Sequence, residues 1–441
     1  MQALPISSTL FLIAAICNEY FLAAALSDDG RIDSGSTLFV IRVFQLAACL
    51  TGAAILSFRC KNGSVLAKCL LATAVLCGVL SVSECLLFAF KIAPVIRVGW
   101  RGVCPAAEKN DLGFRGHPVD YEEHDFVVVL LGDSQVEAKA CAYGLMPETQ
   151  LEQCLQSRID HAIVVSLGAG GYGQDQQLLA LREYFDRGFR ADLVILWQTI
   201  DNDVWNNTFP THWPTNANPK PTFSLVGEKL RLAPELLETY RPSDLQLLRL
   251  WGNLRFRRLD DFWGKSVLPD PYRPLSDRSL PQRDDWQVSF TSRVESGDNF
   301  ENDKNHLSLF LVPRSPRVDY GIQLTRALIT EIEAESNSHG ASLVLFRTSD
   351  TKKLSQLAEP DRYFWTDDGV YHFSREQYDK SVAEITDGFV SLSVPVTFEP
   401  AAVGPTDSHL NEHATAQVMK DLGNLLVDEE WVRRRGRATQ D

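Results

Sequence analysis

Four short segments of the chain carry side chains suited to acyl-transfer chemistry, and the first holds a candidate nucleophile. Gly132, Asp133 and Ser134 directly follow the apolar run 126–131 and precede a helical pattern. A serine at such a junction lies beside backbone N–H groups without intrahelical partners, which can stabilise negative charge developing on a substrate oxygen. The alternative is a plain helix cap after a strand, because Asp and Ser are both favoured at that position.

The second segment is rich in glycine and also follows an apolar run. Residues 166–177 contain the glycines Gly168, Gly170, Gly171 and Gly173, which allow a ligand to approach the backbone closely. Three of them fit a GxGxxG pattern, whose alternative reading is dinucleotide binding. That alternative is disfavoured because the turn after the first strand, where the pattern is expected, is occupied by Ser134 and its neighbours.

The third and fourth segments supply an amide and an imidazole. Asn202 follows the apolar run 192–197 and can donate a hydrogen bond, although Asp201, Asn202 and Asp203 could also simply form a turn. Asp407 and His409 lie two residues apart near the chain end. A carboxylate so placed can hold the imidazole tautomer while the other ring nitrogen faces a nucleophile.

The elements that must position these residues alternate between strands and helices. Continuous apolar runs predict strands buried on both faces at 126–131, 162–167, 192–197 and 342–347. Helical patterns lie between them at 147–158, 174–185 and 323–336. This alternation predicts an α/β fold with a parallel sheet, whose ligands bind beyond the carboxyl ends of the strands.

Taken in order, the four segments resemble the sequence blocks of the SGNH hydrolases, also called GDSL esterases. Ser134 matches the block-one serine, Gly171 the block-two glycine, Asn202 the block-three asparagine, and Asp407 with His409 the last block. The resemblance implies a three-layer, flavodoxin-like sandwich over residues 123–428. Ser166 replaces the usual block-two asparagine, and a single residue separates Asp407 from His409. Gly168 and Gly170 compete with Gly171 for its role.

The resemblance also implies the chemistry. His409 would take the proton from Ser134, Asp407 would support the imidazolium, and the oxyanion would be held by Ser134, Gly171 and Asn202. The expected activity is that of a serine esterase that needs no metal or cofactor. O-acyl groups on envelope carbohydrate or lipid are the expected substrate because the apolar first hundred residues predict an exported domain on a membrane anchor. The alternatives are an O-acyltransferase acting on an extracytoplasmic polysaccharide and an inactive glycan-binding domain. Three tryptophans near Asn202 could stack on sugars or pack in the core: Trp197, Trp205 and Trp213.

The first hundred residues differ from the rest in being strongly apolar. The runs 4–26, 38–58 and 69–90 each approach the length of about 20 residues that a membrane-spanning helix needs. They predict three transmembrane helices within residues 1–95 and a multi-pass membrane protein with an extracytoplasmic catalytic domain, core helices of a soluble domain being the alternative. Glu19, Arg42 and Glu84 lie within these runs and could form one charged cluster or reach the membrane surface separately.

The remaining segments complete the predicted organisation. Residues 96–122 read as a connector, 208–320 as an insertion forming a lid, substrate platform or solvated spacer, and 429–441 as a charged tail. A net charge of −14 disfavours nucleic acid as a partner. Cys141 and Cys154 are the first candidates for a disulfide if the domain is exported.

Overall fold

The computed structural model describes most of the chain beyond residue 100. The described ranges are 101–102, 104–209, 211–212, 218–227, 229–232, 268–281, 303–349, 361–404 and 407–428, together with short helical pieces between residues 8 and 84. The chain divides into two compact units. One comprises Met1–Ile96 with Arg241–Arg255, and the other comprises Arg97–Tyr240 with Phe256–Asp441.

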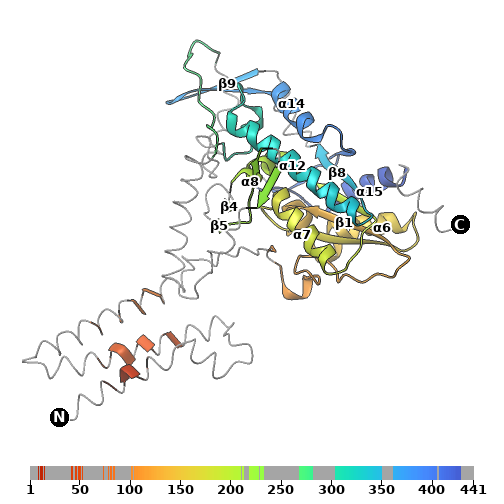
Figure 1. The fold of residues 1–441 in the computed structure, drawn as a ribbon, viewed down its shortest axis with the longest axis horizontal. Coiled ribbons are helices and arrows are strands. Elements are labelled where there is room, and N and C mark those ends of the chain that lie inside the picture. The colour runs from red at the N-terminus through yellow and green to blue at the C-terminus, as the bar shows by residue number, and fades with distance from the viewer. Residues whose placement is uncertain are drawn as a thin grey trace, which may run out of the picture. The chain divides into compact units, whose positions relative to one another are not determined.

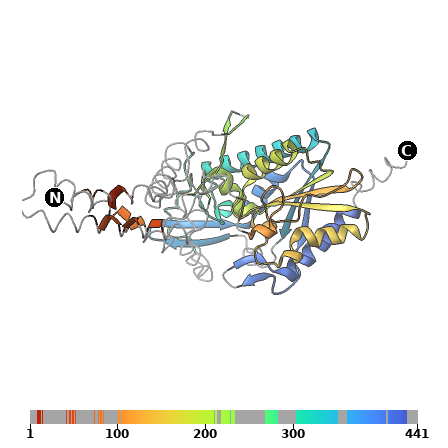
Figure 2. The ribbon, with the colours of Figure 1, turned by 90° about the horizontal axis from the view of Figure 1, so that it is seen from below.

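The second unit is a mixed α/β fold built on a five-stranded parallel sheet (Figures 1 and 2). The order across the sheet is β11-β8-β3-β1-β2, which is the flavodoxin-like order 2-1-3-4-5 in chain sequence. The strands are β1 (Phe126–Gly132), β2 (Ala162–Gly168), β3 (Leu193–Trp197), β8 (Ser342–Ser349) and β11 (Ser391–Pro395). The central strands are apolar at nearly every position because helices cover both faces of the sheet.

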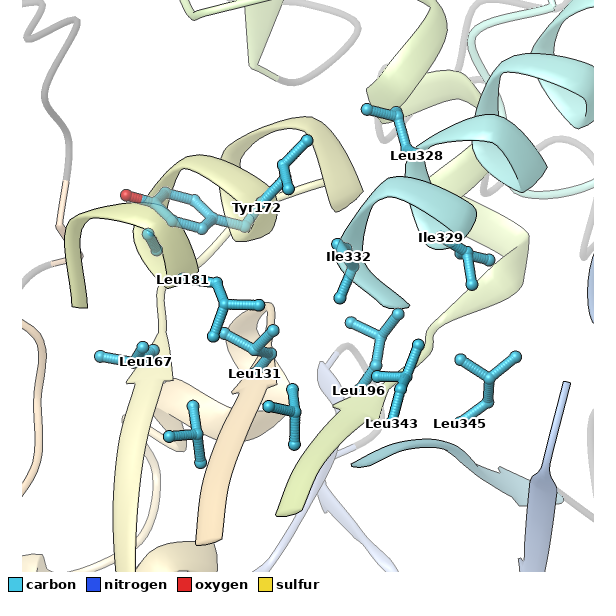
Figure 3. Close-up of a cluster of buried hydrophobic side chains, with 14 of the residues drawn as sticks. Leu131, Leu167, Tyr172, Leu181, Leu196, Leu328, Ile329, Ile332, Leu343 and Leu345 are labelled. Atoms are coloured by element: carbon cyan, nitrogen blue, oxygen red, sulfur yellow. The ribbon is translucent and has the colours of Figure 1, made fainter. Parts of the chain in front are cut away.

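Two pairs of helices form the outer layers. On one face, α7 (Gln174–Asp186) and α12 (Pro316–Ser338) pack over side chains such as Leu131, Leu196 and Leu345 (Figure 3). On the other face, α6 (Pro147–Gln156) and α15 (Glu412–Asp428) cover the intervening side chains of the same strands. The alternation follows from the two-residue repeat of a strand, which sends successive side chains to opposite faces.

Shorter elements surround the sheet. The helices are α5 (Ser134–Glu137), α8 (Ile200–Thr208), α14 (Arg375–Thr386) and the 3-10 turns η1 (Ala106–Glu108), η2 (Tyr143–Leu145) and η6 (Ser308–Phe310). Antiparallel pairs are β4 (Thr211–His212) with β5 (Asn218–Pro219), β6 (Phe223–Val226) with β7 (Lys229–Leu232), β9 (Asp361–Thr366) with β10 (Gly369–Ser374), and β12 (Ala402–Gly404) with β13 (Asp407–Leu410).

The predicted bundle of three transmembrane helices is wrong. Among the residues that the structure describes, no helix is both long and apolar enough to cross a membrane. A crossing helix needs about 20 consecutive apolar residues. The predicted multi-pass membrane localisation is overturned by the same finding. Most residues of these runs lie outside the described part of the chain.

Two charged residues of the first unit form a buried pair. Arg42 Nη1 donates to Glu84 Oε1 at 2.6 Å, and both residues are 5% exposed. A buried charge needs such a partner because its desolvation is otherwise uncompensated. Two members of the predicted cluster therefore meet, while Glu19 lies outside the described residues.

The predicted disulfide between Cys141 and Cys154 is absent, and both cysteines are free thiols. Cys141 Sγ lies 3.8 Å from Thr415 Oγ1, whereas Cys154 Sγ donates to the Lys420 carbonyl at 3.5 Å. The two cysteines thus contact different turns of α15.

The described start of the predicted insertion is packed against the domain. The Lys220 ammonium forms a fully buried ion pair with Asp175 of α7. The hydroxyl of Tyr320 in α12 accepts a hydrogen bond from Leu225 N at 3.2 Å. These contacts contradict the solvated-spacer interpretation for residues 220–225.

Candidate active site

The candidate nucleophile lies at the turn from the central strand β1 into the short helix α5. Gly132 is the last residue of β1 and Ser134 the first of α5. Between them, Asp133 caps the helix, because its Oδ1 accepts a hydrogen bond from Gln135 N at 2.9 Å. The cap interpretation of the triplet is therefore correct for Asp133, and it leaves the Ser134 side chain available for other contacts.

Two glycines allow α5 to rest directly on the strand ends. Gly132 and Gly168 are register partners in the parallel pair β1–β2, and Val136 of α5 packs against both. A Cβ at Gly132 would overlap Val136 Cγ2, and a Cβ at Gly168 would lie 2.5 Å from Val136 Cβ. Glycine at these two positions therefore fixes the distance of Ser134 from the carboxyl ends of the strands.

The candidate base comes from the other end of the chain and meets Ser134. His409 lies on β13, and its Nε2 is 2.7 Å from Ser134 Oγ, although 275 residues separate them. The backbone N–H of Leu410 donates to Gln135 Oε1 at 3.3 Å, which ties β13 to α5. A hydroxyl and an imidazole at this distance can exchange a proton directly.

The start of α15 anchors the strand that carries His409. Asn411 caps this helix, since its Oδ1 accepts from Ala414 N at 2.9 Å. Next to it, Glu412 Oε1 accepts from Ala142 N at 2.7 Å, in the turn that follows α5. The two chain segments that supply Ser134 and His409 are thus joined by several hydrogen bonds.

The position of Asp407 is described only through its backbone. Asp407 begins β13 and pairs with Gly404 of β12. Its side chain lies outside the described residues, so its proposed contact with the imidazole stays a prediction.

Asn202 lies beside the nucleophile turn, in the first turn of α8 rather than in the expected loop. Its Nδ2 donates to Asp133 Oδ2 at 3.3 Å, while its Oδ1 is buried without a hydrogen-bond partner. An amide nitrogen carries two N–H groups, so the bond to Asp133 uses one of them and the second can donate to another acceptor.

The glycine-rich segment approaches Ser134 from β2. Gly170 N donates to Glu137 Oε2 at 2.7 Å, which gives that N–H a partner inside the protein. Gly171 is buried and has a left-handed backbone with φ +78°, a conformation that favours glycine. The bond to Glu137 therefore occupies the Gly170 N–H.

Protein atoms fill the space beside the glycines that suggested dinucleotide binding. A Cβ at Gly168 or Gly170 would lie 2.5 or 2.8 Å from side-chain atoms of α5, and one at Gly173 would overlap Asn207 Oδ1. These glycines are explained by close packing between elements, so the GxGxxG alternative gains no support.

Buried carboxyl groups lie beneath the candidate site. Burial raises the pKa of Asp133, an effect that its hydrogen bonds and the nearby His409 partly offset. Burial, followed by the charge of Asp133, raises the pKa of Asp203 well above its ordinary value. Asp203 Oδ2 accepts from Thr199 N at 3.0 Å, which fixes the start of α8 and thereby Asn202.

Sequence reasoning missed two residues that hold the turn after α5. The Arg115 guanidinium donates to the carbonyls of Glu137, Ala138 and Cys141, at 3.2, 2.5 and 2.9 Å. Glu137 is 2% exposed and holds Gly170 as described above. Arg115 lies in the predicted connector and Glu137 in the short, mostly polar helix Ser134–Glu137, and neither charge carried a sequence signal.

Two of the three tryptophans considered for sugar stacking are core residues. Trp197 and Trp205 are 1% and 3% exposed, and Trp197 packs against Phe346. Trp213 lies outside the described residues. The core alternative is therefore correct for the first two.

The chain is similar to some solved structures. No protein-family model and no curated protein matches the chain. A solved structure described as "a putative arylesterase from Agrobacterium tumefaciens str. C58" aligns with 69% of this chain and 99% of its own. The identity is 13% and the TM-score is 0.30.

Proposed function

We propose that this chain is a serine ester hydrolase of the SGNH type, with Ser134 as nucleophile and His409 as general base. The observation that carries the proposal is the 2.7 Å distance between Ser134 Oγ and His409 Nε2. A serine hydroxyl is a weak nucleophile by itself and needs an adjacent base to become reactive. Its place beyond the carboxyl end of a central parallel strand is where such sheets bind ligands.

The proposed reaction proceeds through an acyl-enzyme. His409 Nε2 takes the hydroxyl proton as Ser134 Oγ bonds to the ester carbonyl carbon. The resulting imidazolium returns the proton to the departing alcohol, whose bond to the acyl carbon breaks. Water then attacks the acyl group with His409 again as base, which releases the acid and restores Ser134. Asp407 is assigned the orienting contact with the other ring nitrogen.

Three donors are assigned to the oxyanion. They are the backbone N–H groups of Ser134 and Gly171 and the second N–H of the Asn202 amide. The bond from Asn202 to Asp133 supports this role because it holds the amide next to the nucleophile turn. Preorganised donors of this kind stabilise the transition state without rearrangement during the reaction.

We propose an ester-bearing carbohydrate or lipid as the substrate class. The single residue between Asp407 and His409, a spacing that some polysaccharide-modifying SGNH relatives share, supports the carbohydrate. The acyl acceptor can be water or a sugar hydroxyl, and the second would make the chain an O-acyltransferase. Incubation of the acylated enzyme with and without a sugar acceptor, followed by mass spectrometry of the products, distinguishes the two.

The test uses a fluorophosphonate probe and a short p-nitrophenyl ester. We expect the probe to modify Ser134, located by peptide mass spectrometry, and the Ser134→Ala variant to lose both labelling and ester hydrolysis. Ser157→Ala is the control, because this exposed serine bonds only within its own helix end and should react as wild type. Full hydrolysis by Ser134→Ala would refute the proposal, and an unlabelled wild type would favour a glycan-binding domain without catalysis.

The oxyanion assignment has a separate test. Asn202→Ala should lower kcat by about 10²–10³-fold with little change in KM, because the lost donor acts mainly in the transition state. An effect confined to KM would make Asn202 a binding residue instead.

A further inference from the structure

Two histidines and an aspartate lie together at the amino-terminal ends of β1 and β2, whereas the candidate active site lies at the carboxyl ends of the strands. Their potential ligand atoms all lie within 4.8 Å of one another: His124, Asp125 and His161. The seven residues of β1 separate this cluster from Ser134, a span of roughly 25 Å at about 3.3 Å per residue. The proposed esterase mechanism makes no use of these three side chains.

The register of two strands brings the cluster together. Asp125 directly precedes Phe126 of β1, and His161 directly precedes Ala162 of β2, and Phe126 and Ala162 are register partners. The Phe126 N–H also donates to the His161 carbonyl at 3.0 Å, which fixes the backbone beside the imidazole. A site on strand ends is held more rigidly than one on a free loop.

The nearly buried carboxylate of Asp125 faces both imidazoles. Asp125 Oδ2 accepts from Glu122 N at 2.6 Å, and this bond orients the group. The other oxygen, Oδ1, lies 3.6 Å from His124 Nε2 and 3.9 Å from His161 Nδ1. Two ligand atoms bound tetrahedrally at about 2.0–2.1 Å from one ion lie roughly 3.4 Å apart, so small side-chain rotations suffice.

A second carboxylate, that of Glu122, lies beside the other ring nitrogen of His124. His124 Nδ1 lies 3.6 Å from Glu122 Oε2, so the nitrogen remote from Asp125 has an acidic neighbour. Metal-bound histidines usually have such a partner, which fixes the tautomer and strengthens the ligand. The two rings meet edge to face with centroids 5.0 Å apart, and both side chains are more than half exposed, which gives an ion access from solvent.

From this geometry we propose that His124, Asp125 and His161 form a binding site for a divalent transition-metal ion, with zinc as the representative ion. Two imidazoles and one carboxylate suit Zn²⁺ and its neighbours better than Mg²⁺ or Ca²⁺, which prefer oxygen ligands. The bound ion links the starts of β1 and β2, and water fills the remaining coordination position. Because it binds the folded arrangement of two strands, it stabilises the fold.

The test measures zinc binding to the full-length, tag-free chain by isothermal titration calorimetry and thermal unfolding. We expect one Zn²⁺ per chain, a Tm raised by ZnCl2 and no such rise with MgCl2. The variant His124→Ala/His161→Asn should bind Zn²⁺ at least about tenfold more weakly. Asn is chosen because His161 has φ +59°, a backbone conformation that Asn tolerates.

The control variant removes a histidine outside the cluster. His413→Gln changes an exposed residue of α15 that stacks on Phe398, and it should bind Zn²⁺ as wild type does. Equal zinc affinity in wild type and the double variant would overturn the proposal, as would a wild type that binds no zinc. Circular dichroism of the double variant without metal verifies that it is folded.

Discussion

The backbone N–H of Leu410 donates to the side-chain oxygen of Gln135 at 3.3 Å, so the residue after the candidate base is bonded to the residue after the candidate nucleophile. This contact fixes the relative position of two segments that otherwise come from opposite ends of the domain. Loss of this hydrogen bond should therefore lower kcat, since small displacements of reacting groups have large kinetic effects.

Replacing Gln135 tests this contact. Gln135→Leu removes the acceptor for Leu410 N, and we expect kcat for a p-nitrophenyl ester to fall roughly tenfold or more because His409 is less well positioned. Gln135→Glu keeps an acceptor oxygen and should retain most of the activity. Steady-state kinetics of both variants provide the measurement, and equal kcat values for Gln135→Leu and wild type would contradict the role.

The packing of α5 on the strand ends predicts a specific steric coupling. Gly132→Ala places a methyl group on Val136, and we expect the free energy of unfolding to fall by about 1–3 kcal/mol. In a Val136→Ala background the same change should cost less, because the overlapping Cγ2 is gone. Gly144→Ala is the control, since a Cβ there meets nothing within 4 Å. Urea unfolding of the four variants measures the coupling, and strictly additive costs would argue against the contact.

The raised pKa of Asp303 predicts that the stability of the protein depends on pH. Burial raises its pKa to about 6 in the folded protein, against an ordinary value of 3.8. Below pH 3.8 the Asp303 carboxyl is protonated in both the folded and the unfolded protein. As the pH rises above this value, the carboxyl ionises first in the unfolded chain. Its contribution to stability is therefore lost as pH rises from about 4 through 6, by up to about 3 kcal/mol.

The Asp303→Asn variant isolates this effect. Asn retains an oxygen for the hydrogen bonds from Tyr272 N and Ser315 Oγ and tolerates the left-handed backbone at φ +59°. We expect the variant to lose less stability than wild type between pH 4 and pH 7. Chemical denaturation across this range measures it, with Asp277→Asn, an exposed carboxyl, as control. Parallel curves for Asp303→Asn and wild type would refute the prediction.

The buried pair of Lys220 and Asp175 predicts non-additive costs. Burial lowers the pKa of Lys220 and raises that of Asp175, and each charge offsets this effect on the other. Lys220→Met leaves the Asp175 carboxylate without its cation and should cost about 3–5 kcal/mol of stability. Adding Asp175→Asn should recover much of that loss, because Asn207 and Gln176 can still bond to residue 175. Thermal or urea unfolding of the single and double variants gives the coupling energy. A double variant no more stable than Lys220→Met would contradict it.

Much of the sheet was predictable because a parallel strand leaves a local signal. The strands 126–131, 162–167, 192–197 and 342–347 correspond to β1, β2, β3 and β8, since burial on both faces requires a continuous apolar run. The strand β11 (Ser391–Pro395) was missed because it is the last strand of the sheet and exposed residues alternate with Leu392 and the buried Val394, so it has no continuous apolar run. The start of α12 was missed although Ser315 caps it and Pro316 occupies its first turn, a recognisable signature.

The errors came from patterns that have more than one physical cause. Apolar runs of about 20 residues suggested membrane spans, yet no helix among the described residues meets that requirement. Cys141 and Cys154 are close in sequence but contact separate turns of α15. Sequence spacing alone does not give a spatial distance.

By itself the sequence determined the apolar strands, the glycines between them and which side chains could do chemistry, because those properties depend on residue type and local periodicity. Only the tertiary structure decided that Ser134 and His409 meet, that Gly170 bonds to Glu137, and that His161 lies beside Asp125. These contacts join residues far apart along the chain. They follow from strand order and register, which the collective packing of the two helical layers on the sheet determines.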